Sequence, residues 1–246
     1  MLWGRVGRFG AFQARRILMR ACMLLCLSLI AIALYLWGAW EVRGHLEEIG
    51  GLTILGGVWL LAARSAFAWL GLSVHDDALE RNNRAAFIAI CGGILGITFI
   101  FTGGNLGEGP TYWNNVFSAA VGTAGLFALW LVMEMGAHVS ASISVERDLA
   151  SGLRMGAFLT SVGLMFGRAL AGDWHSMTGT IHDFFRDGWP ALVLLGSAIY
   201  IEHRIRPSIL CPFPNWGVCG LIPSICYLVF ALLWIWHLGA WEGMPR

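Results

Sequence analysis

Three charged residues in this sequence, Arg64, Glu134 and Glu202, lie within or beside long apolar runs, where a charge is costly. Arg64 falls about eight residues from one end of its run, which is roughly 12 Å at the rise of an α-helix. A charge at that depth costs several kcal/mol unless it pairs or its long side chain reaches the surface. Glu134 is the expected partner because it lies near the same end of a later run. Glu202 occupies the matching place in the second copy of an internal sequence repeat. Such a group could relay protons or ions through a helix bundle. A structural ion pair, or an arginine that reaches the membrane surface, is the other interpretation.

Two histidines with neighbouring carboxylates occur in the polar segment between residues 172 and 189. His175, His182 and Asp183 are weak candidates for a divalent-metal site or a pH sensor. Their spacing matches no defined metal motif, and the aromatic residues around them are typical of a segment at the membrane surface. The sequence also has no HExxH, GxSxG or phosphate-binding glycine loop. We therefore expect no resident metal, no cofactor and no catalytic activity.

Six glycines form three pairs with four-residue spacing: Gly92 and Gly96, Gly152 and Gly156, and Gly163 and Gly167. Residues at this spacing share one face of a helix, and a face of glycines lets another backbone approach closely. The pattern predicts close helix packing within one chain or between copies. A flexible or conducting seam is the functional alternative.

The elements that must position these residues are apolar segments, because 57% of the chain is hydrophobic and only 13% is charged. About 20 helical residues cross a hydrocarbon core of about 30 Å. The sequence therefore predicts an all-α polytopic membrane bundle of about seven transmembrane helices. The expected spans are Ala21–Trp40, Ile49–Leu72, Ala85–Gly104, Val116–Ala137, Met155–Ala171, Trp189–Ile201 and Val218–Trp241. A net charge of +1 argues against nucleic acid as a partner.

Three of these spans have an alternative interpretation. Met155–Ala171 is marginal in length, and Trp189–Ile201 is too short unless the preceding HDFFRDG continues the helix. The first run begins like a signal peptide, with Ala31-Ile32-Ala33 as a small-residue cleavage site. It continues well beyond that site, so we expect an uncleaved span.

Arginine placement predicts the orientation, because cytoplasmic loops of membrane proteins carry an excess of basic residues. A cytoplasmic N-terminus places on that side Arg5, Arg8, Arg15, Arg16, Arg20, Arg81, Arg84, Arg147, Arg154, Arg204 and Arg206. The arginines left outside are Arg43, Arg168, Arg186 and Arg246. We therefore expect a bacterial inner (plasma) membrane protein whose N-terminus is cytoplasmic and whose C-terminus is outside.

One pattern occurs twice, as ERNNRAAFIAICGGILGITFIFTGG from Glu80 and ERDLASGLRMGAFLTSVGLMFGRALAG from Glu146. Each copy has a charged start, an apolar run rich in small residues, a polar loop and a second apolar run. This arrangement predicts a tandem repeat of a two-helix hairpin in parallel orientation. The expected division is an N-terminal hairpin that resembles a degenerate repeat (1–76), repeat 1 (77–139), repeat 2 (140–206) and a C-terminal transmembrane helix (207–246).

The region from about residue 80 to residue 202 resembles the YjfL-like domain-of-unknown-function family of bacterial inner-membrane proteins. In the first copy the resemblance is carried by Asn82-Asn83-Arg84-Ala85-Ala86 with Gly92, Gly93 and Gly96. In the second it is carried by Ala150-Ser151-Gly152, Gly156, Gly163, Gly167 and Gly172-Asp173-Trp174. The second copy departs from the pattern, with Asp148-Leu149 where the first has Asn82-Asn83. The resemblance implies paired hairpins in the inner membrane, and the family has no settled activity to transfer.

The function expected from these observations is that of a non-catalytic component of an envelope or membrane protein complex. Its partners would be the lipid bilayer and another membrane protein or a second copy of this chain. A small transporter or channel that uses the repeat interface is the alternative, and an intramembrane enzyme comes third.

Overall fold

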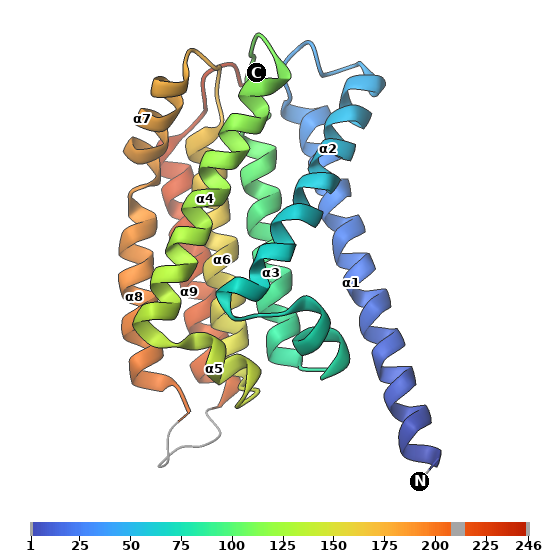
Figure 1. Cartoon of the computed structure of the whole chain (residues 1–246). Helices are drawn as coiled ribbons and strands as arrows, with labels where there is room; N and C mark the ends of the chain where they lie inside the picture. Colours follow the sequence, from blue (N-terminus) through green and yellow to red (C-terminus); the bar gives the residue numbers. More distant parts are fainter. Residues whose placement is uncertain (1, 208–214, 245–246) are drawn as a thin grey trace.

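The computed structural model describes residues 2–207 and 215–244, and in this part of the chain all regular structure is helical (Figure 1). The α-helices are α1 (Leu2–Trp37), α2 (Leu46–Ser65), α3 (Arg84–Gly103), α4 (Tyr112–Ala137), α5 (Val139–Ser144), α6 (Leu149–Leu170), α7 (Met177–Gly188), α8 (Pro190–Ile205) and α9 (Ile222–Leu238). The 3-10 helix η1 (Ala66–Leu70) and the π-helical turns η2 (Val74–Glu80) and η3 (Trp216–Leu221) connect or extend them. We call the end of the bundle where α1 begins the N-terminal face, and the other end the opposite face.

Six helical stretches are long and apolar enough to cross a membrane, which indicates a membrane protein. They are Phe12–Trp37, Leu46–Leu70, Arg84–Gly103, Tyr112–Ala137, Leu149–Leu170 and Trp216–Leu238. The predicted sixth span, Trp189–Ile201, falls in α8, which has only 16 residues. The HDFFRDG segment before it is helical, as part of α7, and Trp189 between the two helices keeps a right-handed helical backbone. Pro190 separates α7 from α8 because proline has no amide hydrogen to continue the helical bonding.

Several predicted bounds differ from the observed ones because residues outside the apolar runs extend the helices. Helix α1 includes the arginine-rich segment before Ala21 and ends before Trp40. Helix α6 begins at Leu149, six residues before the predicted start, because Asp148 caps it by accepting hydrogen bonds from the amides of Ala150 and Ser151. The resulting 22-residue helix is long enough to span a membrane, so its predicted marginal length was wrong.

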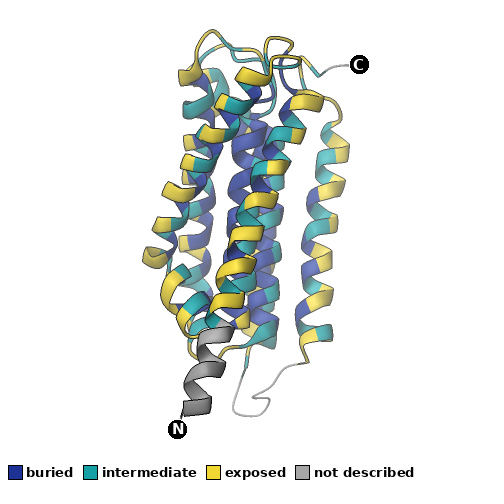
Figure 2. Cartoon of the chain, turned by 90° about the vertical axis from the view of Figure 1, so that its right-hand side faces the viewer, coloured by how far each residue is buried: buried dark blue, intermediate teal, exposed yellow. Residues whose placement is uncertain are grey.

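Helices α3 and α6 form the centre of the bundle, and the other helices surround them (Figure 2). In the most apolar 18 residues of each of these two helices, 72% of the residues are buried. The corresponding share is 22% for the first stretch, 28% for the second and 22% for the last. The central pair is therefore enclosed by protein on nearly all sides, whereas α1, α2 and α9 leave most of their apolar surface outside.

Glycine allows the backbones of α3 and α6 to touch. An added Cβ at Gly92 would meet the backbone of Gly156, and one at Gly163 would meet the backbone of Gly96. The remaining glycines of the predicted set, Gly152 and Gly167, face the backbone of α3 in the same way. Residue numbers rise together along the interface, so the two helices run parallel. All six predicted packing glycines lie in this one seam, within a single chain.

The connectors that lead into α3 and α6 on the N-terminal face have the same local geometry. Asn83 caps α3 and Asp148 caps α6 through their side-chain oxygens. Each cap is preceded by a residue with positive φ, Asn82 at 49° and Arg147 at 57°. On the opposite face, the amide of Glu108 donates to Asp173 Oδ1 at 2.9 Å, and these two residues are 65 apart. On the N-terminal face, Asn82 and Arg147 are also 65 residues apart, and so are the caps Asn83 and Asp148.

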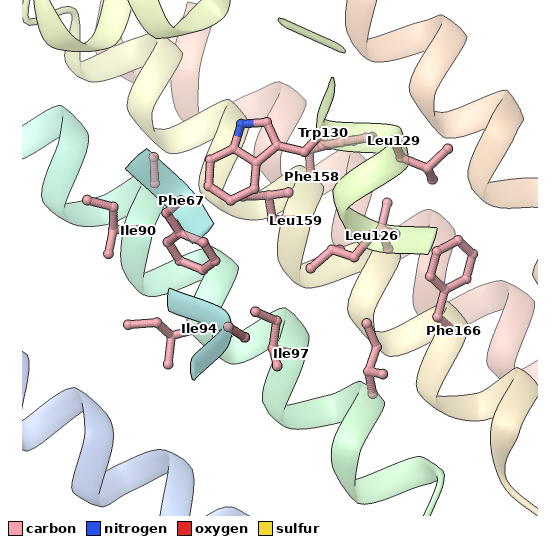
Figure 3. Packing of buried hydrophobic residues seen from close by; sticks show 14 of the residues in the cluster. Phe67, Ile90, Ile94, Ile97, Leu126, Leu129, Trp130, Phe158, Leu159 and Phe166 are labelled. Carbon is pink, nitrogen blue, oxygen red and sulfur yellow. The ribbon is translucent and has the colours of Figure 1, made fainter. Parts of the chain in front are cut away.

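Aromatic residues fill the space on one side of the central pair (Figure 3). The short helix η1 carries Phe67 into the core, where its ring centroid lies 4.9 Å from that of Trp130 on α4. Both side chains are fully buried. The absence of a side chain at Gly93 of α3 leaves room for both rings. Thus the small residues of α3 serve two neighbours, α6 on one face and this aromatic pair on another.

A methyl group added in the seam should destabilise the fold, whereas the same change on the bundle surface should not. We expect Gly163→Ala to lower the free energy of unfolding by about 3 kcal/mol or more, because the new Cβ overlaps backbone that has no rotamer to adjust. Gly196→Ala on α8 is the matched control, since nothing lies within 4 Å of its added Cβ. Alanine favours a helix over glycine, so the control should be neutral or slightly stabilised. Thermal unfolding in mild detergent measures both. Equal stability of the two variants would contradict the closed seam.

Candidate functional site

The candidate site is a buried ion pair near the N-terminal face. Arg154 lies on the second turn of α6, and Glu202 lies near the end of α8. Their side chains are 0% and 2% exposed. Arg154 Nε donates to Glu202 Oε1 at 2.5 Å, and Arg154 Nη2 donates to Oε2 at 2.7 Å. This bidentate geometry is the strongest form of an arginine–carboxylate interaction.

Two further groups complete the bonding of the guanidinium. Arg154 Nη2 also donates to Ser151 Oγ at 2.9 Å, and Nη1 donates to the carbonyl of Cys219 in η3. Ser151 Oγ in turn donates to Asp148 Oδ2 at 2.7 Å, the same carboxylate that caps α6. The ion pair therefore joins α6, α8 and the turn that leads into α9. A buried charge pair is tolerated only when such additional hydrogen bonds satisfy it.

Tyr227 of α9 is the polar group near this pair that lacks a partner. It is 3% exposed, and its hydroxyl has no hydrogen-bond partner among the described residues. Helix α9 packs against α6, which carries Arg154. The site thus contains a buried hydroxyl without a hydrogen-bond partner among the described residues, together with an ion pair whose two charges neutralise each other.

The structure separates the predicted group of Arg64, Glu134 and Glu202. Glu202 pairs with Arg154, a residue that the sequence analysis assigned to the cytoplasmic surface. Glu134 accepts hydrogen bonds from the amide and hydroxyl of Ser140 at 2.9 and 2.6 Å, which fixes the start of α5. Arg64 is half-buried and lines a groove between α1 and α2. Within the described residues it has no carboxylate partner, so the expected Arg64–Glu134 pair is not formed.

Arg154 was missed because α6 was expected to begin at Met155. With the helix starting at Leu149, Ser151 and Arg154 are three residues apart and share a face that points into the bundle. A capping signal was present in the sequence, since Asp148 is followed by small and apolar residues. That signal moves the start of the helix upstream of Arg154 and would have placed the arginine inside it.

The predicted metal candidates do not form a metal site in the described part of the chain. His175 contacts Glu242 at 3.4 Å, whereas His182 contacts its neighbour Asp183 at 3.5 Å. Asp183 is also paired with Arg186 at 3.0 Å. Among described residues the group with metal-ligand spacing is a different one, His75, Asp76 and Glu80 on η2, and all three are exposed.

A polar cavity of about 300 Å³ lies at the opposite face, between α6, α7 and the chain after α9. Most of the charges that line it are already engaged. Arg186 donates to both oxygens of Asp187 at 2.8 and 2.9 Å. Arg168 donates to the carbonyls of Gly239 and Ala240, each at about 3 Å. These bonds hold the end of the chain against α6, so the cavity belongs to the packing of the opposite face.

Comparison with known proteins gives no match: no family model, no curated protein and no solved structure is significantly similar to this chain. The resemblance to the YjfL-like family therefore stays a prediction. The candidate site is defined by the geometry of this chain alone.

Breaking the buried pair should cost far more than removing an exposed charge. We expect Arg154→Met or Glu202→Gln to lower the free energy of unfolding by about 3–5 kcal/mol, because each leaves the other group buried without its counter-charge. The double variant should lose much less than the sum of the two single losses. Arg204→Met, an exposed residue of the same helix end, is the control. Unfolding curves in detergent give all four values. Single variants as stable as the control would show that the pair contributes nothing.

Proposed function

We propose that this protein is a non-catalytic integral membrane protein of the bacterial inner membrane and a component of a membrane protein complex. The observation that carries this proposal is the contrast between the interior and the surface of the bundle. The interior is closed: the α3–α6 seam is filled by backbone, and the deepest charges satisfy each other. The surface is open: α1, α2 and α9 expose long apolar faces.

The proposed architecture is a tandem repeat of two hairpins with seven spans. Residues 65 apart have the same role in several places, including the caps Asn83 and Asp148. The same separation relates Tyr112 and Met177, the first residues of α4 and α7. On this correspondence α7 and α8 together are the counterpart of α4. The sixth span in chain order is then the nearly continuous helix from Met177 to Ile205, and with it the number of spans is seven.

The proposed orientation keeps the N-terminus in the cytoplasm and the C-terminus outside. Arg154 no longer counts toward the arginine bias, because its side chain is buried. The remaining cationic positions on the N-terminal face still outnumber those on the opposite face. Short connectors on both faces leave the helix surfaces as the main area for contact with partners.

The alternative, a transporter or channel at the repeat interface, has less support. A path between the repeats requires α3 and α6 to separate, and their backbones are in contact over the length of the seam. Arg64 and Glu134, the residues expected to line that path, do not pair. Arg64 lines the groove between α1 and α2, and Glu134 is bound by Ser140. An intramembrane enzyme would need several free polar groups in one cavity, and the Arg154–Glu202 pair is occupied by its own bonds.

Extraction of the protein from its native membrane in a mild detergent tests the component role. We expect a second protein to co-migrate in a fixed ratio, quantified by mass spectrometry, because the exposed faces of the outer helices would be covered by it. The Gly163→Ala variant, which is expected to loosen the fold, should lose that partner, whereas Gly196→Ala should retain it. A homogeneous monomer or homo-oligomer would reject the component role. Solute flux into liposomes, compared between the natural protein and Glu134→Gln, would then test transport.

A further inference from the structure

A groove of about 710 Å³ lies between α1 and α2, in the region where the two helices diverge toward the N-terminal face (Figure 1). Its walls come from α1, α2 and η2. The apolar side chains that form them are Phe12, Met19, Met23, Leu24, Leu27, Leu61 and Leu79, and His75 of η2 also lines the groove. Three arginines, Arg16, Arg20 and Arg64, also line it. The groove therefore combines a long apolar wall with a concentration of positive charge from two helices.

These three arginines have no acidic partner in the described part of the chain. The carboxylates of η2 at this end, Asp76 and Glu80, contact His75 at 3.3 and 3.5 Å instead. Arg15, which precedes Arg16 in α1, does have a polar partner. Arg15 donates from Nε to Asn82 Oδ1 at 2.7 Å and lies over the ring of Phe87. Arg15 thus fixes α1 against the start of α3. Among the groove arginines, Arg16 lies over the ring of Phe12, a contact that leaves its positive charge without a counter-charge.

The position of these charges in the helices favours a counter-ion beside them. Arg20 and Arg64 both lie within stretches that are apolar enough to span a membrane. A cation in such a stretch is costly unless it meets an anion or water at the surface. Along α1 the distance from Arg16 to Leu27 is about 16 Å at helical rise, close to half of a hydrocarbon core of about 30 Å. The groove therefore has the length of one leaflet, with its charge toward the surface.

We propose that the groove binds an anionic phospholipid from the leaflet at the N-terminal face. The phosphate would lie among the guanidinium groups of Arg16, Arg20 and Arg64, which bind phosphate with high geometric specificity. The acyl chains would lie along the apolar wall formed by α1 and α2. An anionic lipid fits better than a zwitterionic one, because three cations surround a single phosphate and a choline group would add a fourth. The proposal depends on the membrane location and not on the component role.

Lipid binding to the purified full-length protein tests the proposal directly. The probes are dioleoyl phosphatidylglycerol and dioleoyl phosphatidylcholine, titrated into detergent-solubilised protein and followed by native mass spectrometry. We expect the natural protein to prefer phosphatidylglycerol by at least about tenfold. The triple variant Arg16→Gln, Arg20→Gln, Arg64→Gln should lose this preference. The matched control, Arg84→Gln, Arg147→Gln, Arg204→Gln, removes the same charge from exposed positions outside the groove and should retain it.

A second variant keeps the test decisive if the triple variant does not fold. Met23→Trp leaves every charge in place and fills the apolar part of the groove, so it should also reduce retention of phosphatidylglycerol about tenfold. Equal binding of both lipids by the natural protein, or an unchanged preference in both groove variants, would overturn the proposal. A second copy or another polypeptide that occupies the groove would appear as added protein mass that phosphatidylglycerol does not displace, and this result would overturn it as well.

Discussion

The contact between the backbones of α3 and α6 is the constraint on which the rest of this structure depends. Apolar side chains gain little from meeting each other instead of lipid tails, so helices in a membrane associate largely through close van der Waals packing. The glycines of the seam bring two backbones together without the entropy cost of ordering side chains. Once this pair is fixed, its remaining faces define where α1, α2 and α4 pack on one side and where α8 and α9 pack on the other.

The buried ion pair belongs to the second of the two proposed repeats. On the proposed 65-residue correspondence, the counterparts of Arg154 and Glu202 are Ala89 and Ala137, both buried. This correspondence does not match Glu202 to Glu134, as the sequence pattern had led us to expect. The first half therefore has two small apolar residues where the second has an ion pair. The pair binds the carbonyl of Cys219, so it attaches η3 and α9 to the second half.

The location of unpaired charge separates structural roles from surface roles. Deep in the bundle, Arg154 and Glu202 neutralise each other, and at the start of α5 Glu134 is bound by Ser140. On the outer helices, Arg16, Arg20 and Arg64 line a groove and have no acidic partner among the described residues. In the described part of the chain, the charges without a counter-charge therefore lie at the outer surface and not in the seam. This distribution is the physical basis of the proposed interaction role.

The sequence by itself determined the helical class, most of the membrane-spanning stretches and the glycines of the seam. Each of these depends on local information: the length of an apolar run, or a four-residue spacing that places small residues on one helix face. The sequence did not determine which charges meet. Arg154 pairs with Glu202, 48 residues away, because Asp148 starts α6 early and the packing of α8 brings the carboxylate opposite. Arg64 and Glu134 each lie near the end of a helix, but they do not pair. Depth along a helix follows from chain length, whereas the partner of a side chain depends on which helix face turns toward which neighbour, and only the tertiary packing decides that.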